Sequence, residues 1–464
     1  MDPRMRRLQE EPVGKLLWHF SLPAIAGMMV GSLYTVIDRA FLGNVVGPDA
    51  LAGLSVCMPI TFVMLAFGML IGVGTGALVS IRLGQQKHAE AEVILGNATT
   101  LTLVVAVVIG GGFLLVLTPL LTLFGASPVT LPYAKQFLQI ILLGSFFQYA
   151  SFGLNAIIRA EGNPRLAMLT MFINASINII LDVVFVLWLD FGVPGAAVAT
   201  VIAQAVSAIW TLGHFRSRRS VLRLHLKNLV PHWQIIRPAL AIGLSPFVMH
   251  LGASVISLLA NRGLSHYGGD VAVGAYGIIS ALSMLILMPV FGLNQGAQPI
   301  VGYNFGAANI ARVKHTLKLS VLAATGVVLI GFVLVEAFPT ALVHAFAKDP
   351  LLIQVGARGL RICLVMLPIV GFQVVSANFF QAVGKARTAL VLSLLRQVIV
   401  LIPLLILLPH VMGLDGVWAA GPIADGVASL LTGFALLREL RHLDALPGPA
   451  APNLTNVTAA VGAE

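Results

Sequence analysis

The chain has 464 residues, of which 58% are hydrophobic and 10% charged, and its mean hydropathy is +0.95. Soluble domains carry about 25% charged residues, so this composition excludes a water-soluble globular protein. The net charge of +10 does not indicate nucleic-acid binding, because the basic residues follow the loops of a membrane protein.

Apolar stretches of roughly 20 residues recur along the whole chain, and each is long enough to cross a bilayer as a helix. The sequence predicts an all-α polytopic membrane protein with about twelve spans. In chain order we place them near 17–42, 51–80, 93–117, 131–155, 166–188, 194–214, 240–262, 272–300, 316–340, 358–380, 387–408 and 414–438.

The basic residues set the expected orientation. Of 28 Lys and Arg, 21 fall in the N-terminus, the even-numbered loops or the C-terminus. The positive-inside rule therefore predicts a multi-pass protein of the cytoplasmic (inner) membrane with both termini in the cytoplasm. The other seven lie in spans or odd-numbered loops.

An internal repeat divides the chain into two halves. The second half aligns with the first at an offset of about 222 residues, so that Pro23 meets Pro246, Gly84 meets Gly306, and the segment 159–165 meets 381–387. Six spans per half give both halves the same orientation, which predicts two six-helix bundles related by a pseudo-two-fold axis along the membrane normal. We expect an N-terminal bundle over 1–215, a cytoplasmic linker over 216–238, a C-terminal bundle over 239–440 and a disordered cytoplasmic tail over 441–464.

Two acids lie inside apolar spans of the N-terminal half, Asp38 in the first span and Asp182 in the fifth. An ionisable residue within a membrane is costly and indicates a functional site. Helix geometry places Asn178 one turn from Asp182, Tyr34 one turn from Asp38, and Thr200 at a similar depth on the sixth span. Carboxylate, amide and hydroxyl oxygens suit a proton or Na⁺, so these five residues are the predicted ion-coupling site, with a possible Na⁺ held by Asp38, Asn178, Asp182 and Thr200.

Other positions carry weaker indications. Polar residues within spans are candidates for lining a substrate cavity, although hydrogen bonding between helices explains them about as well; they are Asn155, Gln148, Asn174, Asn261, Gln295 and Asn378. Pro23 removes a backbone hydrogen bond inside the first span and is a candidate hinge. The glycines of the GVGTG segment, residues 72–76, indicate close helix packing rather than phosphate binding.

The chain resembles the multidrug and toxic compound extrusion (MATE) family, and within it the branch of the DNA-damage-inducible protein F type. The resemblance covers roughly residues 10–440 and rests on LYTVIDRAFLG, GVGTGALVSIRLGQ, RAEGNPR and NIILDVVF followed by GVPGAAVAT. It implies a secondary antiporter that exports cationic amphipathic drugs or toxins in exchange for H⁺ or Na⁺. It also implies ion-coupling roles for Asp38, Asp182, Asn178 and Thr200, and a bend of the first span that Pro23 permits.

Alternative functions remain open at this stage. A flippase for lipid-linked precursors belongs to the same superfamily, but it tends to use cationic cavity residues, whereas the expected cavity residues here are acids. An enzyme is not expected, because no metal-ligand spacing and no nucleophile paired with a base occurs in the sequence. We expect no cofactor beyond the coupling ion, small organic cations as substrates, the lipid bilayer as surroundings, no nucleic-acid partner, and a monomer.

Overall fold

A computed structural model describes residues 2–444, apart from some side chains between 35 and 51. The tail predicted over 441–464 lies outside the described residues from 445 onward. All regular elements described are helical. The first half comprises α1 (Pro3–Glu10), α2 (Val13–Val45), α3 (Pro48–Gly84), α4 (His88–Val105), η1 (Ala106–Gly110), α5 (Gly111–Leu115), α6 (Leu117–Leu123), α7 (Leu131–Leu143), α8 (Ser145–Ala160), α9 (Pro164–Asp182), η2 (Val183–Trp188) and α10 (Gly192–Arg216).

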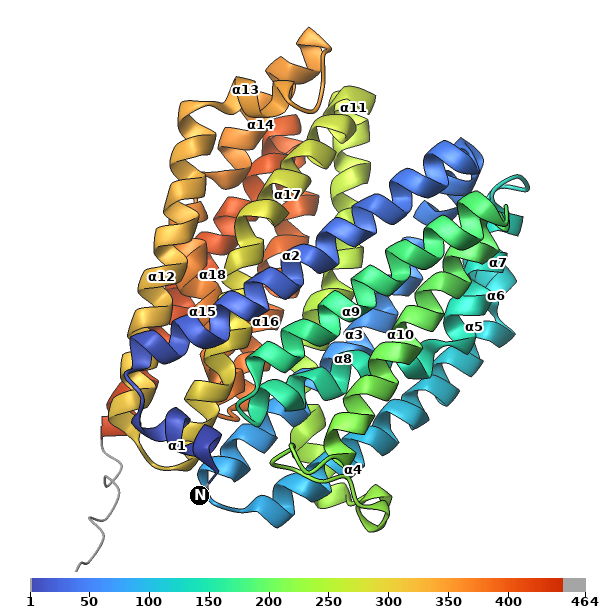
Figure 1. Ribbon diagram of the computed structural model, residues 1–464. Coiled ribbons are helices and arrows are strands. Elements are labelled where there is room, and N and C mark those ends of the chain that lie inside the picture. The colour runs from blue at the N-terminus through green and yellow to red at the C-terminus, as the bar shows by residue number, and fades with distance from the viewer. Residues whose placement is uncertain (1, 445–464) are drawn as a thin grey trace, which may run out of the picture.

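The second half follows a connection that contains the short helix η3 (Leu226–Leu229). Its elements are α11 (Trp233–Gly306), α12 (Ile310–Ala337), α13 (Pro339–His344), α14 (Pro350–Leu364), α15 (Leu367–Ala382), α16 (Ala386–Leu394), η4 (Leu395–Leu401), α17 (Ile402–Met412) and α18 (Leu414–Asp444). Figure 1 shows the two halves as two bundles that stand side by side.

Each predicted span is present as helix. Within the described residues, nine helices are long and apolar enough to cross a membrane, and the pairs α7–α8 and α14–α15, bent by 56° and 47°, bring the number to eleven. The long helix α11 contains Gly269 with φ +64°, a left-handed conformation that glycine adopts without strain, so α11 supplies two spans. The prediction of an all-α membrane protein with about twelve spans is confirmed.

We call the end of the molecule that carries Pro3 and Asp444 the proximal end, and the opposite end the distal end (Figure 1). At the proximal end a buried acid fastens the connection between the bundles to the N-terminal one. Glu161 is fully buried and accepts hydrogen bonds from the Ser220 hydroxyl at 2.7 Å and the Val221 amide at 3.1 Å, and it also contacts the His214 ring and the Arg4 guanidinium. The segment that joins the halves is therefore held in place.

Helix α2 belongs to both bundles. Its proximal half packs against α11, where the Ser21 hydroxyl donates to the Leu293 carbonyl at 3.5 Å. From Gly27 onward it also packs against α9, with Gly27 directly beside Met171, while Met28 and Ser32 still contact α11. Figure 1 shows α2 crossing obliquely from one bundle to the other.

The bundles meet in the proximal half through glycines that we call the glycine seam: Gly74, Gly84, Gly243, Gly292, Gly296 and Gly306. A Cβ atom added at Gly243 would lie 1.9 Å from the Leu70 carbonyl oxygen, and one at Gly74 would lie 2.0 Å from that of Ala239. Because the neighbouring atoms are backbone, only glycine allows this approach. The prediction that the GVGTG segment serves close helix packing is confirmed.

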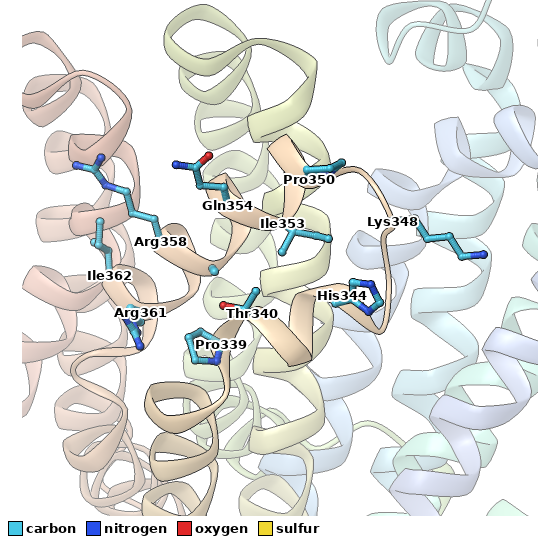
Figure 2. A pocket seen from close by; sticks show the side chains of 11 residues that line it. Pro339, Thr340, His344, Lys348, Pro350, Ile353, Gln354, Arg358, Arg361 and Ile362 are labelled. Atoms are coloured by element: carbon cyan, nitrogen blue, oxygen red, sulfur yellow. The ribbon is translucent and has the colours of Figure 1, made fainter.

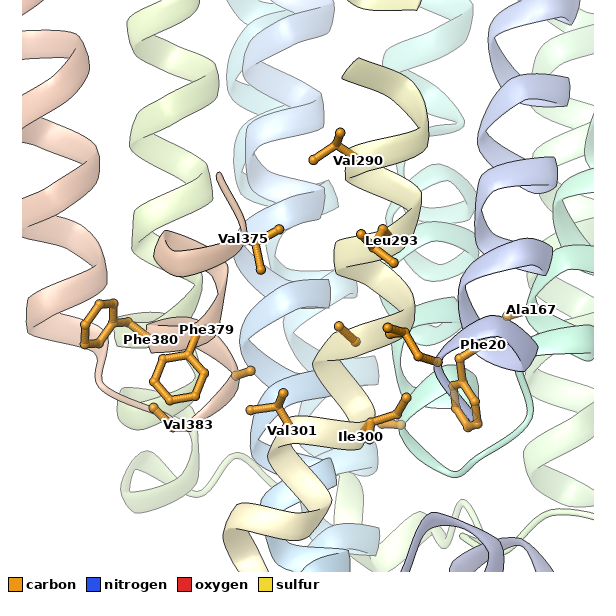
Figure 3. Packing of buried hydrophobic residues seen from close by; sticks show 14 of the residues in the cluster. Phe20, Ala167, Val290, Leu293, Ile300, Val301, Val375, Phe379, Phe380 and Val383 are labelled. Carbon is orange, nitrogen blue, oxygen red and sulfur yellow. The ribbon is translucent and has the colours of Figure 1, made fainter. Parts of the chain in front are cut away.

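Apolar side chains fill the space around the seam. One buried cluster contains residues of both bundles, among them Phe20 of α2, Leu293 and Ile300 of α11, and Phe379 of α15. Figure 3 shows Phe20 on one side of α11 and Phe379 on the other, with Leu293 and Ile300 on α11 between them. The proximal halves of the two bundles thus share one continuous core.

Candidate functional site

The distal half of α9 carries a polar stripe. Asn174, Asn178 and Asp182 follow one another at intervals of four residues and so lie on one face of the helix. Asn178 is 1% exposed and Asp182 is fully buried. Asp182 is also the last residue before the π-helical segment η2, a kind of distortion that is frequent at functional sites.

Helix α10 supplies the partner of this stripe. The Asn178 side-chain amide donates a hydrogen bond to the Thr200 hydroxyl at 3.2 Å, and that hydroxyl donates to the Ala196 carbonyl at 3.0 Å. The structure therefore brings the predicted residues Asn178, Asp182 and Thr200 together between α9 and α10.

Helix α2 brings a second acid to the same place. The Asp38 carboxyl group is close enough to that of Asp182 for direct electrostatic interaction. Asp38 and Tyr34 are both half-buried, and Tyr34 lies one turn before Asp38 on α2. The five predicted residues thus occupy three helices that pack on one another, α2 on α9 and α9 on α10.

Several oxygen atoms of this site are buried without a donor. Among the described residues, no hydrogen-bond donor other than Asp38 reaches the carboxyl oxygens of Asp182, and none reaches the side-chain carbonyl oxygens of Asn174, Asn178 and Gln204. A carboxylate buried in this way is costly unless a proton or a cation joins it. The arrangement can therefore hold a positive charge.

The other predicted cavity residues have different surroundings. Asn155 is buried and donates to the Ala167 carbonyl at 2.9 Å, which ties α8 to α9, and it contacts Arg159. Gln148 is half-buried, with its side-chain oxygen lacking a donor among the described residues. A role for these two residues in a cavity stays a prediction.

In the C-terminal bundle, Asn261 is exposed on α11. Gln295 contacts the sulfur of Met28 across the interface between the bundles at 3.2 Å, and Asn378 donates to the Asn294 carbonyl at 3.3 Å. Asn378 and Asn294 also line a water-sized void of about 10 Å³ between α11, α12 and α15. These contacts tie helices together, and their role in a cavity stays a prediction.

The sequence pattern also indicates Arg396 and Asp425 as weaker cavity candidates, but it predicts neither their ion pair nor a role for Gln204. Gln204 lies one turn beyond Thr200 on α10, and that spacing is the signal that identifies it. In the C-terminal bundle, Arg396 in η4 donates to the Asp425 carboxylate of α18 at 2.7 Å. In the internal repeat, η4 and α18 correspond to α9 and α10, the helices that carry Asp182 and Thr200.

Within the described part of the chain, no three or more His, Cys, Asp or Glu side chains gather in a group suited to a metal ion. Cys57 and Cys363 are free thiols in their helices. A cation at Asp182 would therefore depend on carboxyl oxygens together with the amide oxygen of Asn178 and the hydroxyl of Thr200.

Comparisons with known proteins agree with this architecture. The MatE family model matches residues 23–184 and 247–407. Multidrug export protein MepA of Staphylococcus haemolyticus is 28% identical over 441 residues, which cover 95% of this chain and 97% of that protein. MepA of Staphylococcus aureus is 26% identical over 433 residues, which cover 92% and 94%.

Solved structures resemble the chain over nearly its whole length. The MATE multidrug transporter DinF-BH, solved in complex with R6G, is 40% identical with a TM-score of 0.87, and the match covers 94% of this chain and 98% of that one. A MATE protein in complex with MaL6 has a TM-score of 0.90 at 23% identity, covering 96% and 100%, and this match shows the same fold.

Proposed function

The chain belongs to the MatE family of multidrug efflux transporters, and we propose that it is a secondary antiporter that exports small cationic amphipathic compounds in exchange for H⁺ or Na⁺. We place it in the cytoplasmic membrane as a monomer, with the proximal end in the cytoplasm. The observation that carries the proposal is the buried carboxyl group of Asp182, which interacts directly with that of Asp38 and receives no hydrogen bond from any other described residue.

Two acids in contact favour the uptake of one positive charge. When both are ionised, their negative charges repel each other in a medium of low dielectric constant, and a proton or Na⁺ between them removes that repulsion. A cationic substrate near the pair is attracted while the pair is ionised and released once the pair has taken up its ion.

Asn178 and Thr200 supply a way to distinguish the two ions. The Asn178 side-chain amide group donates to Thr200, and its carbonyl oxygen has no hydrogen-bond donor among the described residues, so we assign this oxygen as a ligand of the bound ion. A proton needs only one carboxyl oxygen, whereas Na⁺ needs several oxygen ligands. Loss of the Asn178 oxygen therefore weakens Na⁺ coupling strongly and proton coupling weakly.

The glycine seam supports alternating access. It joins the bundles in the proximal half, while Asp38 and Asp182 lie in the distal half. Because the closed seam joins the bundles on the proximal side, opening the site toward the cytoplasm requires the seam to separate. Pro23, next to the seam contacts of Ser21 and Ile25, is where we place the hinge of α2.

Efflux of ethidium from proteoliposomes tests the proposal under an imposed pH gradient and, separately, an imposed Na⁺ gradient. We expect efflux with at least one gradient and its loss in Asp182→Asn. The matched control is Asp190→Asn, the same change at an exposed acid a few residues further along the chain. Full efflux by Asp182→Asn would exclude the site, and no efflux by the parent protein under either gradient would exclude the antiport.

A further inference from the structure

A groove of about 870 Å³ opens at the distal end of the C-terminal bundle, far along the chain from the carboxyl pair. It lies between α13 and the first turns of α14, as Figure 2 shows. Pro339 and Thr340 line it from α13, and Ile353 and Gln354 line it from α14. A groove of this volume accepts a group the size of a lipid headgroup.

Basic residues surround the groove. Lys348 extends from the loop between the helices, Arg358 and Arg361 stand on α14, and His344 ends α13 (Figure 2). Lys348, Arg358 and Arg361 are three of the seven cations that do not follow the positive-inside pattern. Their gathering at one distal groove therefore needs a reason other than membrane topology.

The internal repeat shows that the fold does not need these charges. The segment FAKDP (346–350) corresponds to FGASP (124–128) at the offset of 222, and α6 with α7 forms the same elbow as α13 with α14. At the positions equivalent to the three cations, the N-terminal half has Ala126, Gln136 and Gln139. The N-terminal elbow has a single cation, Lys135, at a neighbouring position, so the fold does not need charges at these three positions and the cluster of three is particular to the C-terminal half.

The cations remain accessible to a ligand. Arg358 pairs with Asp415, and Arg361 lies 3.6 Å from Glu336, but all four side chains are at least 30% exposed. Such exposed pairs contribute little stability, so an anion competes with them readily. Lys348 makes no hydrogen bond or ion pair with its side chain among the described residues.

Apolar side chains place the groove at the edge of the bilayer. Phe338, Phe346 and Leu351 lie next to lining residues along the chain and are each more than half exposed. Exposed aromatic and aliphatic side chains next to basic ones are typical of the membrane–water boundary. We propose that the groove binds the phosphate headgroup of an anionic phospholipid from the leaflet that surrounds the distal end, with Arg358, Arg361 and Lys348 as its ligands. Guanidinium groups pair with phosphate through two hydrogen bonds, which suits the two arginines to this role.

Native mass spectrometry of the delipidated protein titrated with phosphatidylglycerol tests the proposal. The groove variant replaces Lys348, Arg358 and Arg361 with glutamine. We expect its affinity for the first lipid bound to fall roughly fivefold for each cation removed, on the order of a hundredfold in all. The charge-matched control replaces three exposed arginines of the proximal connection with glutamine, Arg216, Arg218 and Arg223, and should bind the first lipid as the parent protein does.

Three further arms make the result specific. Arg358→Lys with Arg361→Lys keeps the charge and should retain most of the binding, which separates a lost ligand from a damaged fold. Equal binding of phosphatidylcholine, displacement of the lipid by millimolar inorganic phosphate, or unchanged phosphatidylglycerol affinity in the groove variant would each overturn the proposal. Ethidium efflux by the groove variant is read separately, since this proposal does not depend on the coupling site.

Discussion

The glycine seam allows a quantitative test of how the bundles move. In Gly243→Ala the new methyl group would lie 1.9 Å from the Leu70 carbonyl oxygen and 2.7 Å from its carbon. Both atoms belong to the backbone of α3, so no side-chain rotation relieves the overlap. The two helices have to separate by at least about 1 Å before the contact becomes acceptable.

The cost of this overlap falls on one conformation. Overpacking a well-packed contact costs about 1–3 kcal/mol. If the seam separates during transport, the state with the seam open contains no overlap and keeps its free energy. The ratio of open to closed molecules should therefore rise by a factor of about 5–150.

The assay uses a thiol buried in the seam. Ser80 is 1% exposed, and its Cβ would lie 2.8 Å from a Cβ added at Gly302. In a protein with Ser80→Cys and without Cys57 and Cys363, the rate of maleimide labelling reports how often the seam opens. Gly243→Ala should raise that rate by the factor given above.

The matched control is Gly326→Ala on α12, where a new Cβ meets no atom within 4 Å. It should leave the labelling rate unchanged, and melting temperatures of all variants confirm that they are folded. An unchanged rate in folded Gly243→Ala, or an equal increase in Gly326→Ala, would refute the idea that the seam is the moving contact.

Three further predictions concern polar contacts. Arg396→Leu leaves the half-buried Asp425 without its cation and should lower the free energy of unfolding by about 3 kcal/mol. The double variant Arg396→Leu with Asp425→Leu should recover most of that loss in thermal unfolding, and no recovery would argue against a pairwise effect. Glu161→Gln should weaken the attachment of the segment between the bundles at Ser220 and so raise the rate of trypsin cleavage after Arg219. A cleavage rate equal to that of the exposed control variant Glu10→Gln would contradict this. Thr200→Val removes the acceptor of the Asn178 amide and should lower the apparent ion affinity about tenfold in efflux assays. Thr200→Ser keeps the hydroxyl and should retain the affinity of the parent protein, so equal effects of the two variants would indicate a packing effect instead.

Hydropathy and helix periodicity predict much of this molecule because the bilayer restricts what can span it. Every span must form its own backbone hydrogen bonds as a helix, so the length of an apolar stretch alone identifies α2, α3 or α12. The same regularity allowed the proximity of Asp182, Asn178 and Thr200 to be inferred from their depth and spacing. Gln204 follows from that logic too, at one turn from Thr200.

Other features depend on contacts that no local pattern reports. The π-helical segments η2 and η4 are changes of backbone register within spans that read as ordinary apolar runs. The attachment of the connection to Glu161 joins residues about 60 positions apart, and the pair of Arg396 with Asp425 joins residues 29 positions apart. The sequence identifies glycines suited to close packing, but not that Gly243 meets the Leu70 backbone of the other bundle.

The course of α2 between the bundles fixes its helical phase. Ser21 is held against α11 at one end, and Asp38 faces Asp182 at the other. Each residue of an α-helix adds about 100° of rotation and 1.5 Å of rise. A one-residue insertion or deletion between these contacts would therefore turn the carboxyl group of Asp38 away from its partner while leaving the hydropathy of the span intact. The segment between Ser21 and Asp38 thus tolerates exchange of side chains far better than any change in its length.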